Sequence, residues 1–275
     1  MPAITRKAVE WIDQSAQQSP AQPFFLYFPL TAPHTPIAPA DEFKGKSQAG
    51  EYGDFVVEVD WAVGEVLQAL QRNSLADNTL VVFTSDNGPE NFAYKRIRDH
   101  QHASMGDWRG LKRDTWEGGH RVPFLARWPG HIEPNSTSDE VLCLTDIMAT
   151  AAAITGAPLP ETAAEDSYNM LPALIGETRA EPIREATVHH SYSGRFAIRR
   201  GDWVLIDAPT GDDNREPDWR KQERGYKSHD LPGELFNVTE DPMERNNLYG
   251  ERPELVAELK ALLEKYKLEG RSVRR

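Results

Sequence analysis

Two short apolar runs with a long helical repeat between them constrain the fold more than any other part of this sequence. The runs cover residues 24–28 (Phe-Phe-Leu-Tyr-Phe) and 80–83 (Leu-Val-Val-Phe), and their composition is typical of buried strands. Apolar residues recur between them at the spacing of one helix face: Tyr52, Phe55, Val56, Val59, Val63, Val66, Leu67 and Leu70. Strand, helix and strand form a βαβ unit, which predicts a mainly parallel sheet flanked by helices, with its loops at one edge.

The sequence around this unit predicts further elements. We expect a helix that begins at Thr5 as its N-cap, and another over residues 139–154 that places Cys143 in the core. Residues 122–128 (Val-Pro-Phe-Leu-Ala-Arg-Trp) are predicted as a third strand. Residues 89–121 show no clean period, and a loop of that length inside a compact domain is usually functional.

A different pattern follows residues 156–160 (Gly-Ala-Pro-Leu-Pro), where we place a boundary between domains 1–158 and 159–275. Short alternating runs joined by turn residues predict a small antiparallel sheet, formed by residues 187–192, 196–199, 203–206 and 234–238. Leucines on one face predict a terminal helix over residues 253–267, whereas the polar residues 208–232 are predicted as loop.

Composition limits the kinds of partner. The net charge of −12 disfavours binding to nucleic acid and to anionic membranes. Cys143 is the only cysteine, so the chain has no internal disulfide. No apolar run approaches the length of a membrane span, and the first twenty residues lack the apolar core of a signal peptide. The sequence itself therefore carries no visible export address.

Polar side chains follow the second predicted strand at the point where it ends. Ser85, Asp86, Asn87 and Gly88 come directly after the apolar run. These residue types favour turns for backbone reasons alone, which is the simplest interpretation of the segment. Carboxylate and amide oxygens at the carboxyl edge of a parallel sheet are also the ligands that a hard cation prefers. Asp86 and Asn87 are therefore candidate metal ligands.

Two more segments carry candidate chemistry. His34 lies in a proline-rich loop, residues 29–36, after the first apolar run, and prolines hold such a loop stiff. Lys112 opens the segment Lys-Arg-Asp-Thr-Trp-Glu-Gly-Gly in a region with an excess of basic side chains. Each residue alone is typical of an ordinary surface position. A divalent cation and a fixed lysine together are what a site needs to hold a tetrahedral oxyanion such as sulfate or phosphate.

These segments in combination resemble the sulfatase family, the arylsulfatase-like members of the alkaline-phosphatase superfamily. The resemblance is carried by residues 32–36 (Ala-Pro-His-Thr-Pro), 84–88 (Thr-Ser-Asp-Asn-Gly) and 112–123 (Lys-Arg-Asp-Thr-Trp-Glu-Gly-Gly-His-Arg-Val-Pro). Residues 234–248 resemble the family's C-terminal subdomain. The resemblance covers nearly the whole chain in the family's order, and it implies an alkaline-phosphatase-like fold and the hydrolysis of sulfate esters.

The resemblance also implies roles for single residues. Asp86 and Asn87 match calcium ligands, and Lys112 matches the lysine that binds sulfate and neutralises charge as the S–O bond breaks. His34 matches the histidine that contacts the sulfate and assists the leaving oxygen. The expected substrate is an aryl or glycan sulfate. The substrate-lining candidates of this chain are Arg109, Arg113, Trp116 and His120.

The chain departs from the family pattern at the nucleophile. Sulfatases use formylglycine, made from the first residue of a Cys/Ser-x-Pro-x-Arg motif. Cys143 lies in Cys-Leu-Thr-Asp-Ile, and the one stretch with the right spacing, Ala180-Glu-Pro-Ile-Arg184, begins with alanine. We therefore expect the C-terminal part of a sulfatase, incomplete at its N-terminus and inactive alone, with the formylglycine in the missing N-terminal part. An exposed sheet edge would then favour pairing with that missing half or with a second copy of the chain.

Two alternatives stay open at this point. One is a phosphodiesterase or phosphatase of the same superfamily, and the other is a non-catalytic sulfatase-like binding module. A Cys/Ser-x-Pro-x-Arg motif upstream of Met1 in the genome would favour the enzyme, whereas a natural start at Met1 would favour the binding module. The sequence leaves open which ester is cleaved, whether the nucleophile segment acts in trans, and the oligomeric state. Proteins of this family are usually exported, but this chain alone does not define its compartment.

Overall fold

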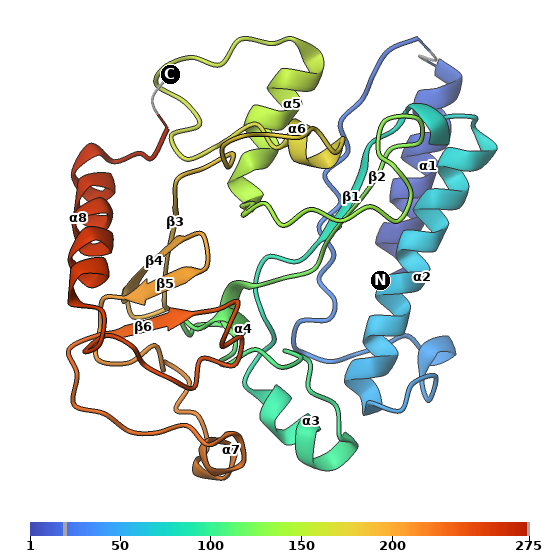
Figure 1. The fold of residues 1–275 in the computed structure, drawn as a ribbon. Coiled ribbons are helices and arrows are strands. Elements are labelled where there is room, and N and C mark those ends of the chain that lie inside the picture. The colour runs from blue at the N-terminus through green and yellow to red at the C-terminus, as the bar shows by residue number, and fades with distance from the viewer. Residues whose placement is uncertain (19–20, 274–275) are drawn as a thin grey trace. The chain divides into compact units, whose positions relative to one another are not determined.

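The computed structural model describes residues 1–18 and 21–273, which form two compact units (Figure 1). The first unit comprises residues 1–82, 95–102 and 126–131. The second comprises residues 83–94, 103–125 and 132–275. The chain passes between the units several times, so each unit is built from segments that are distant in sequence.

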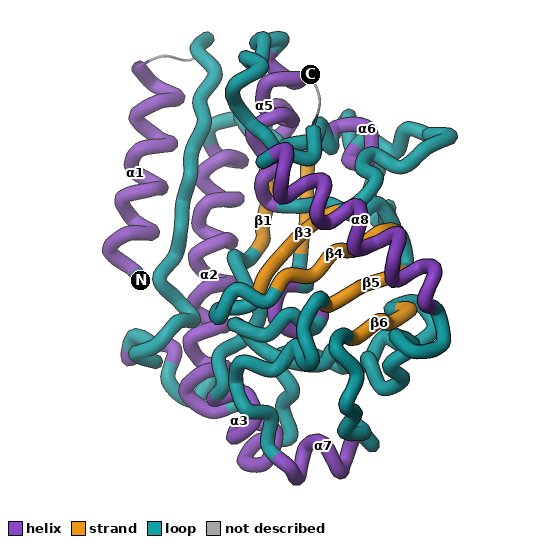
Figure 2. The backbone as a smooth tube through the Cα atoms, turned by 90° about the vertical axis from the view of Figure 1, so that its left-hand side faces the viewer, coloured by secondary structure: helices purple, strands orange, loops and turns teal. Residues whose placement is uncertain are grey.

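Two long helices dominate the first unit: α1 (Pro2–Gln18) and α2 (Gly50–Arg72), which lie side by side (Figures 1 and 2). The predicted α2 is confirmed. The α1 helix begins at Pro2, so the prediction of Thr5 as an N-cap is wrong. Thr5 lies inside the helix and donates from Oγ1 to the Met1 carbonyl oxygen at 3.3 Å.

The core of this unit lies between the two helices. Ile12 from α1 packs with Ala69, Leu70 and Ala76, all buried. Arg72 and Asn73 bind the carboxylate of Asp13 at the edge of this contact, which fixes the end of α2 against α1. The short 3-10 helices η1 (Asp41–Phe43) and η2 (Ala76–Asn78) lie on either side of α2 in the sequence.

Residues 24–28 are extended but do not form the buried strand that the sequence predicts. Phe24 and Leu26 pack against the core between the helices, whereas Phe25 is 70% exposed and Tyr27 is 77% exposed. An extended segment becomes a strand only when its backbone groups pair with a neighbour. The described residues provide no such ladder here, so the segment does not become a strand. The alternating exposure of its side chains shows that only one of its two faces is covered.

The strands predicted near residues 80–83 and 122–128 are confirmed. β1 (Val81–Thr84) and β2 (Phe124–Arg127) pair as a two-stranded sheet. β1 is shifted by one residue from the predicted run 80–83, and β2 is shorter than the predicted run 122–128. β1 carries the chain to the Ser-Asp-Asn-Gly segment, which follows its last residue.

Residues 89–121 contain two helices, which corrects the prediction of an unbroken loop. They are α3 (Phe92–His100) and the single turn α4 (Glu117–His120). The buried face of α3 consists of Ala93, Tyr94 and the charged Arg96, whose guanidinium lies 3.7 Å from the centre of the Tyr52 ring. A helix buried through an arginine and an aromatic ring lacks the aliphatic period that the prediction relied on.

The predicted helix over residues 139–154 begins later than expected. The structure has the 3-10 helix η3 (Leu144–Asp146), then α5 (Ile147–Thr155), and later the short α6 (Leu171–Leu174). Asp146 accepts a hydrogen bond from the Cys143 amide at 2.7 Å, and this bond ends the extended chain before the helix. Cys143 is half-buried outside the helix, with Sγ 3.1 Å from Thr187 Oγ1, so its predicted core-helix position is wrong.

The predicted antiparallel sheet is confirmed in the second unit. It consists of β3 (Thr187–His190), β4 (Phe196–Arg200), β5 (Trp203–Ile206) and β6 (Glu234–Asn237), in that order (Figure 2). The register pairs Ile198 with Leu205 and Leu205 with Leu235, all fully buried. The segment between β5 and β6, predicted as loop, contains α7 (Asp218–Arg224).

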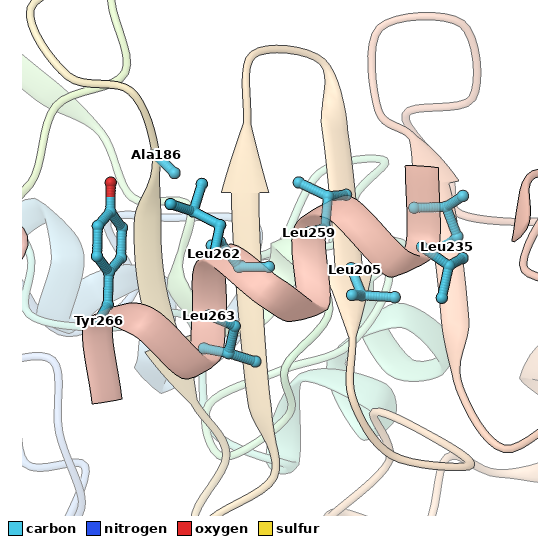
Figure 3. Close-up of a cluster of buried hydrophobic side chains, with 9 residues drawn as sticks. Ala186, Leu205, Leu235, Leu259, Leu262, Leu263 and Tyr266 are labelled. Atoms are coloured by element: carbon cyan, nitrogen blue, oxygen red, sulfur yellow. The ribbon is translucent and has the colours of Figure 1, made fainter. Parts of the chain in front are cut away.

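The terminal helix α8 (Pro253–Glu269) covers one face of this sheet, as the sequence predicts. Figure 3 shows that its apolar residues face the side chains of the strands. The buried cluster comprises Ala186, Ile198, Leu205, Leu235, Val256, Leu259, Leu262, Leu263 and Tyr266. The opposite face of the sheet holds a second buried cluster, built on Val204, Phe236 and Trp116.

Helices and sheets together confirm the predicted mixed α/β class, including the small antiparallel sheet with its helix. None of the helices in the described residues combines the length and the apolar character needed to cross a membrane. The division into domains 1–158 and 159–275 stays a prediction.

The α8 contact leads to a first prediction. We expect Leu259→Ala to lower the free energy of unfolding by about 2–5 kcal/mol, because it leaves a cavity between α8 and the sheet. Leu268→Ala, in the same helix at an 86% exposed side chain, is the matched control and should change stability by less than about 0.5 kcal/mol. Chemical denaturation of the two variants measures both values. Equal effects at the two positions would contradict the packing described here.

Candidate functional site

The turn after β1 presents the predicted metal ligands. Asp86 is exposed, and none of the hydrogen bonds found among the described residues occupies its carboxylate. Asn87 donates from Nδ2 to the Gly88 carbonyl oxygen at 2.9 Å, which leaves its amide oxygen available. Ser85 Oγ donates to the Asn87 carbonyl oxygen at 3.1 Å and closes the turn. The turn therefore offers two hard oxygen donors that the protein itself does not use.

Backbone hydrogen bonds join this turn to the segment that carries Lys112. The Gly88 amide donates to the Gly119 carbonyl oxygen at 2.9 Å, and the Lys112 amide donates to the Pro89 carbonyl oxygen at 2.9 Å. The structure thus joins the Asp86–Asn87 turn and the Lys112 loop through their backbones. The chemical roles of these side chains stay predictions.

Glycines permit this close approach. A Cβ atom on Gly88 would clash with the Gly118 carbonyl oxygen, and one on Gly118 would clash with the carbonyl oxygens of Arg109 and Gly110. A Cβ atom on Gly119 would meet the carbonyl oxygens of Asp114 and Leu111. The Gly-Gly pair and Gly88 are therefore required by backbone packing, independently of any turn preference.

Lys112 is the cation that this arrangement leaves accessible. Its side chain is 26% exposed, and Nζ lies 3.9 Å from Glu90 Oε1. Arg113 holds the same carboxylate more closely, through two hydrogen bonds of 2.7 and 2.8 Å. These bonds hold the pKa of Glu90 below its usual range and satisfy the carboxylate. Lys112 is therefore free to bind an anion, whereas Arg113 is occupied.

The excess of basic side chains in residues 89–121 does not form an open positive patch. Lys95 pairs with Asp99, and Arg121 pairs with Glu117 at 2.9 Å. Together with the Arg113–Glu90 pair, these contacts neutralise much of the local charge. The sequence could not show this pairing because Glu90 lies 23 positions from Arg113.

Trp116 is buried and Arg109 is largely covered, with 10% of its side chain exposed, so both residues pack within the second unit, and their contact with substrate stays a prediction. Trp116 is 1% exposed and donates from Nε1 to Glu234 Oε2 at 2.9 Å. The Arg109 guanidinium lies between two rings, 3.6 Å from the centre of Trp116 and 4.0 Å from that of Tyr226. These contacts fix the two ends of the Lys112 loop in the interior of the second unit.

His120 packs against His189 of β3, with the ring centroids 3.7 Å apart and the ring planes tilted by 42°. Both rings approach the Thr115 carbonyl oxygen through Nε2, at 3.3 Å for His120 and 3.0 Å for His189. Desolvation lowers the pKa of His120 to about 4 and that of His189 to about 3. At neutral pH both rings are therefore uncharged donors that tie β3 to the Lys112 loop.

His34 lies in the first unit, in the turn that residues 31–36 form. Its amide donates to the Thr31 carbonyl oxygen at 3.1 Å, and its Nδ1 lies 2.7 Å from the Thr35 carbonyl oxygen. This contact fixes the tautomer with the proton on Nδ1, so that Nε2 is free to accept a proton or a hydrogen bond. The role of His34 as the histidine that contacts the sulfate stays a prediction.

Three polar residues after β5 hold the Lys112 loop, and the sequence analysis did not single them out. Asn214 donates from Nδ2 to the Lys112 carbonyl oxygen at 2.6 Å. Glu234 binds the Trp116 indole, and Glu244 accepts from the Glu117 amide at 3.0 Å. Glu234 and Glu244 lie in the segment that resembles the C-terminal subdomain, which was the only signal for them.

The donor set at the turn fits a hard divalent cation in part. The oxygens of Asp86 and Asn87 are of the type that Ca²⁺ prefers, and the protein does not occupy them. Calcium takes six to eight oxygen ligands, more than this pair provides. No group of three or more histidine, cysteine, aspartate or glutamate side chains suited to a metal occurs within residues 1–18 and 21–273. The Asp86–Asn87 pair alone does not complete such a site, and metal binding stays a prediction.

Comparison with known proteins defines the family. The family model described as Sulfatase matches residues 2–157, which is more than half of the chain. The chain belongs to the sulfatase family.

Similar proteins extend the match beyond that region. N-acetylgalactosamine-6-O-sulfatase of Bacteroides thetaiotaomicron is 37% identical over 273 residues, and the match covers 96% of this chain and 50% of that protein. Human arylsulfatase A is 35% identical, with 88% of this chain and 48% of that protein covered. The chain spans about half the length of these curated relatives.

A solved structure supports the fold assignment. A structure from work on glycosaminoglycan metabolism by Bacteroides thetaiotaomicron has a TM-score of 0.80 and 36% identity to this chain. The match covers 96% of this chain and 53% of that one. It confirms the predicted alkaline-phosphatase-like α/β fold class, with the antiparallel sheet and helix that follow.

Glu216 generates a prediction about pH. This buried carboxyl lies 3.5 Å from Arg109 Nε, near Asp212 and two tyrosines, and burial raises its pKa from 4.5 to about 7. Because the folded state binds this proton more tightly than the unfolded state, stability falls as the pH rises from about 4.5 to about 7. Glu216→Gln removes this dependence, so its stability relative to wild type should improve between pH 5 and pH 8, by up to about 3 kcal/mol.

Guanidinium denaturation of wild type and Glu216→Gln at both pH values measures the effect. The Asp218→Asn variant, at an exposed side chain in α7, is the control and should follow wild type. A Glu216→Gln variant that loses as much stability as wild type between pH 5 and pH 8 would show that this carboxyl does not titrate there.

Proposed function

We propose that this chain carries the lysine, histidine and metal-ligand side of the active site of a sulfate ester hydrolase. The observation that carries the proposal is the juxtaposition of Lys112 with the Asp86–Asn87 turn through the Pro89 and Gly119 carbonyl oxygens. An accessible cation next to unused oxygen donors suits a tetrahedral oxyanion held between a lysine and a metal ion. Membership of the sulfatase family supports sulfate as this oxyanion.

In this proposal Lys112 binds the sulfate and neutralises the charge that develops when the S–O bond breaks. Its backbone is held by hydrogen bonds at both the amide and the carbonyl, so the charge is positioned before the substrate arrives. A preorganised charge of this kind stabilises an anionic transition state without reorganisation during the reaction. Arg113 contributes by holding Glu90, which would otherwise compete for Lys112.

His34 and the Asp86–Asn87 pair supply the other functions. His34 has Nε2 free, and we propose that this atom donates or accepts the proton exchanged with the leaving oxygen. Asp86 and Asn87 would hold Ca²⁺, which when bound polarises the sulfate oxygens. None of the 275 residues lies in a Cys/Ser-x-Pro-x-Arg motif, so the formylglycine nucleophile and the remaining calcium ligands would come from outside them. The chain alone is then inactive.

Sulfated glycans are the substrate class that we favour over aryl sulfates. The relative with a match over 96% of this chain is named for a 6-sulfated amino sugar, and a similar structure comes from work on glycosaminoglycan metabolism. Arg113 and His120 remain the candidates for contact with the sugar, because both keep part of their side chains exposed. The family model ends at residue 157, which supports the proposed boundary between domains 1–158 and 159–275.

Substitution of Lys112 tests the sulfate role. In the complete protein, Lys112→Ala should lower kcat for a 6-sulfated N-acetylgalactosamine substrate by about 10²–10³, or roughly 3–4 kcal/mol, because a positioned charge beside the oxyanion is lost. Lys112→Arg should keep partial activity, since arginine retains the charge but not the compact donor geometry. Steady-state kinetics on the sugar and on a chromogenic aryl sulfate compare the two substrate classes.

Lys95→Ala provides a matched control, because Lys95 lies in the same segment but pairs with Asp99 on an exposed helix face. It should retain the turnover of wild type. Near-wild-type turnover of Lys112→Ala would remove Lys112 from the site. A complete protein that cleaves no sulfate ester of either class would overturn the proposed function itself.

Asp86 tests the metal role. We expect Asp86→Ala in the complete protein to need a higher concentration of Ca²⁺ for half-maximal activity and to bind Ca²⁺ more weakly in titration calorimetry, because one carboxylate ligand is lost. Asp77→Ala, at an exposed position before β1, is the control and should bind Ca²⁺ like wild type. Unchanged Ca²⁺ affinity in Asp86→Ala would exclude this residue as a ligand.

A further inference from the structure

We infer that Glu244 is a positioning residue for Lys112: its side chain and backbone clamp the two ends of the loop formed by residues 109–117. This inference rests on the proposed function, because it assigns Glu244 a purpose in that same site. Glu244 lies 132 positions from Lys112 and touches neither substrate nor metal in the proposal.

The clamp consists of two hydrogen bonds at opposite ends of the loop. Oε2 of Glu244 accepts from the Glu117 amide at 3.0 Å. The Glu244 carbonyl oxygen accepts from Arg109 Nη1 at 3.2 Å. Glu117 and Glu244 are both fully buried, so water cannot replace either bond. One residue therefore fixes where the loop begins and where it ends.

The backbone of Glu244 indicates that its side chain is required. Its φ is +52°, in the left-handed region where a residue other than glycine, asparagine or aspartate is uncommon. A glutamate held there carries backbone strain that the surrounding contacts must offset. Burial, together with the neighbouring Glu117, raises the pKa of Glu244 well above its usual value, so the buried side chain binds a proton tightly.

Glu117 transmits the contact to neighbouring elements. Its own Oε2 accepts from Arg121 at 2.9 Å and from Arg199 of β4 at 3.1 Å. The clamp thereby joins the loop to the antiparallel sheet, which α8 supports from its other face. The loop is thus held by a rigid element and not only by its own turns.

A second tie acts at Lys112 itself. Asn214 donates to the Lys112 carbonyl oxygen at 2.6 Å, while the Asp114 carboxylate accepts from the Asn214 amide at 3.0 Å and from the Leu111 amide at 2.8 Å. Asp114 and Asn214 therefore fix the middle of the loop, and Glu244 fixes its ends. Because a lysine has a long flexible side chain, the place of its charge depends on how firmly its backbone is held.

Hydrogen exchange tests the clamp without any assay of activity. We expect Glu244→Leu, which removes the acceptor but keeps the bulk, to speed amide exchange in residues 109–119 at least about tenfold, with little change in β3, β4 and α8. Glu244→Gln keeps an acceptor at the same place and should restore protection close to that of wild type. Leu259→Ala, which weakens the sheet–α8 core, is the control and should not act selectively on this loop.

Kinetics of the complete protein test the consequence for Lys112. At a temperature well below unfolding, Glu244→Leu should lower kcat about tenfold or more, Glu244→Gln should recover most of it, and Leu259→Ala should leave it unchanged. Asn214→Leu, which removes the tie at Lys112, is a second variant with the same expected direction, should Glu244→Leu fail to fold.

The outcomes separate the inference from the proposed function. Uniform loss of protection in Glu244→Leu, or equal loss in Glu244→Gln and Glu244→Leu, would overturn the clamp. Selective loss of protection with unchanged kcat would show that the clamp does not position Lys112 for turnover, and would overturn the inference. If wild type cleaves no sulfate ester, the proposed function fails, while hydrogen exchange still decides whether Glu244 holds the loop.

Discussion

The site depends on the close approach of two backbone segments, the turn after β1 and the Glu-Gly-Gly segment. Gly88 donates to Gly119, and side chains at Gly88 or Gly118 would separate the two segments. In the proposed site, the oxygens of the Asp86–Asn87 turn and the charge of Lys112 can bind one small anion only because the two backbones are in contact. The rest of the second unit maintains this contact, because the carboxyl groups and amides that hold the loop come from residues beyond β5.

Buried carboxyl groups are the means by which the loop is held. Glu234, Glu244 and Glu216 are all buried, and burial raises the pKa of Glu216 and of Glu244. Burial of an acid normally destabilises a fold unless its hydrogen bonds are satisfied. Here Glu234 and Glu244 accept from the Trp116 indole and the Glu117 amide. Among the described residues, Glu244 Oε1 and Glu216 Oε2 accept no hydrogen bond, and Arg109 Nε lies 3.5 Å from Glu216. Apolar residues of similar size at these places would often give equal or higher stability. The buried acids therefore serve to fix the position of the loop rather than to stabilise the fold.

Pairing of charges decides which cation in the loop is available. Arg109, Arg113 and Arg121 each face a glutamate, and the neighbouring His120 and His189 are uncharged near neutral pH. Lys112 makes only a distant contact of 3.9 Å with an acid that Arg113 already satisfies. Within residues 89–121, which the structure describes throughout, Lys112 is thus the lysine that lies next to the turn and lacks a hydrogen-bonded acidic partner. One such charge suits a small anion better than a broad polyanion.

The sequence by itself determined the elements with a strong period and the polar motifs that follow them. Helices α2 and α8, the antiparallel strands and β1 were predictable because their apolar residues recur at the spacing of a helix or strand. The segments with Asp86, Asn87 and Lys112 were recognisable because few residue types suit an oxyanion site. The tertiary structure decided what those patterns could not: that residues 24–28 lack a ladder, that α3 is buried through Arg96, and that Trp116 belongs to the core. It also decided that Asn214 and Glu244 hold the Lys112 loop, because hydrogen bonds between residues more than a hundred positions apart leave no local pattern in a sequence.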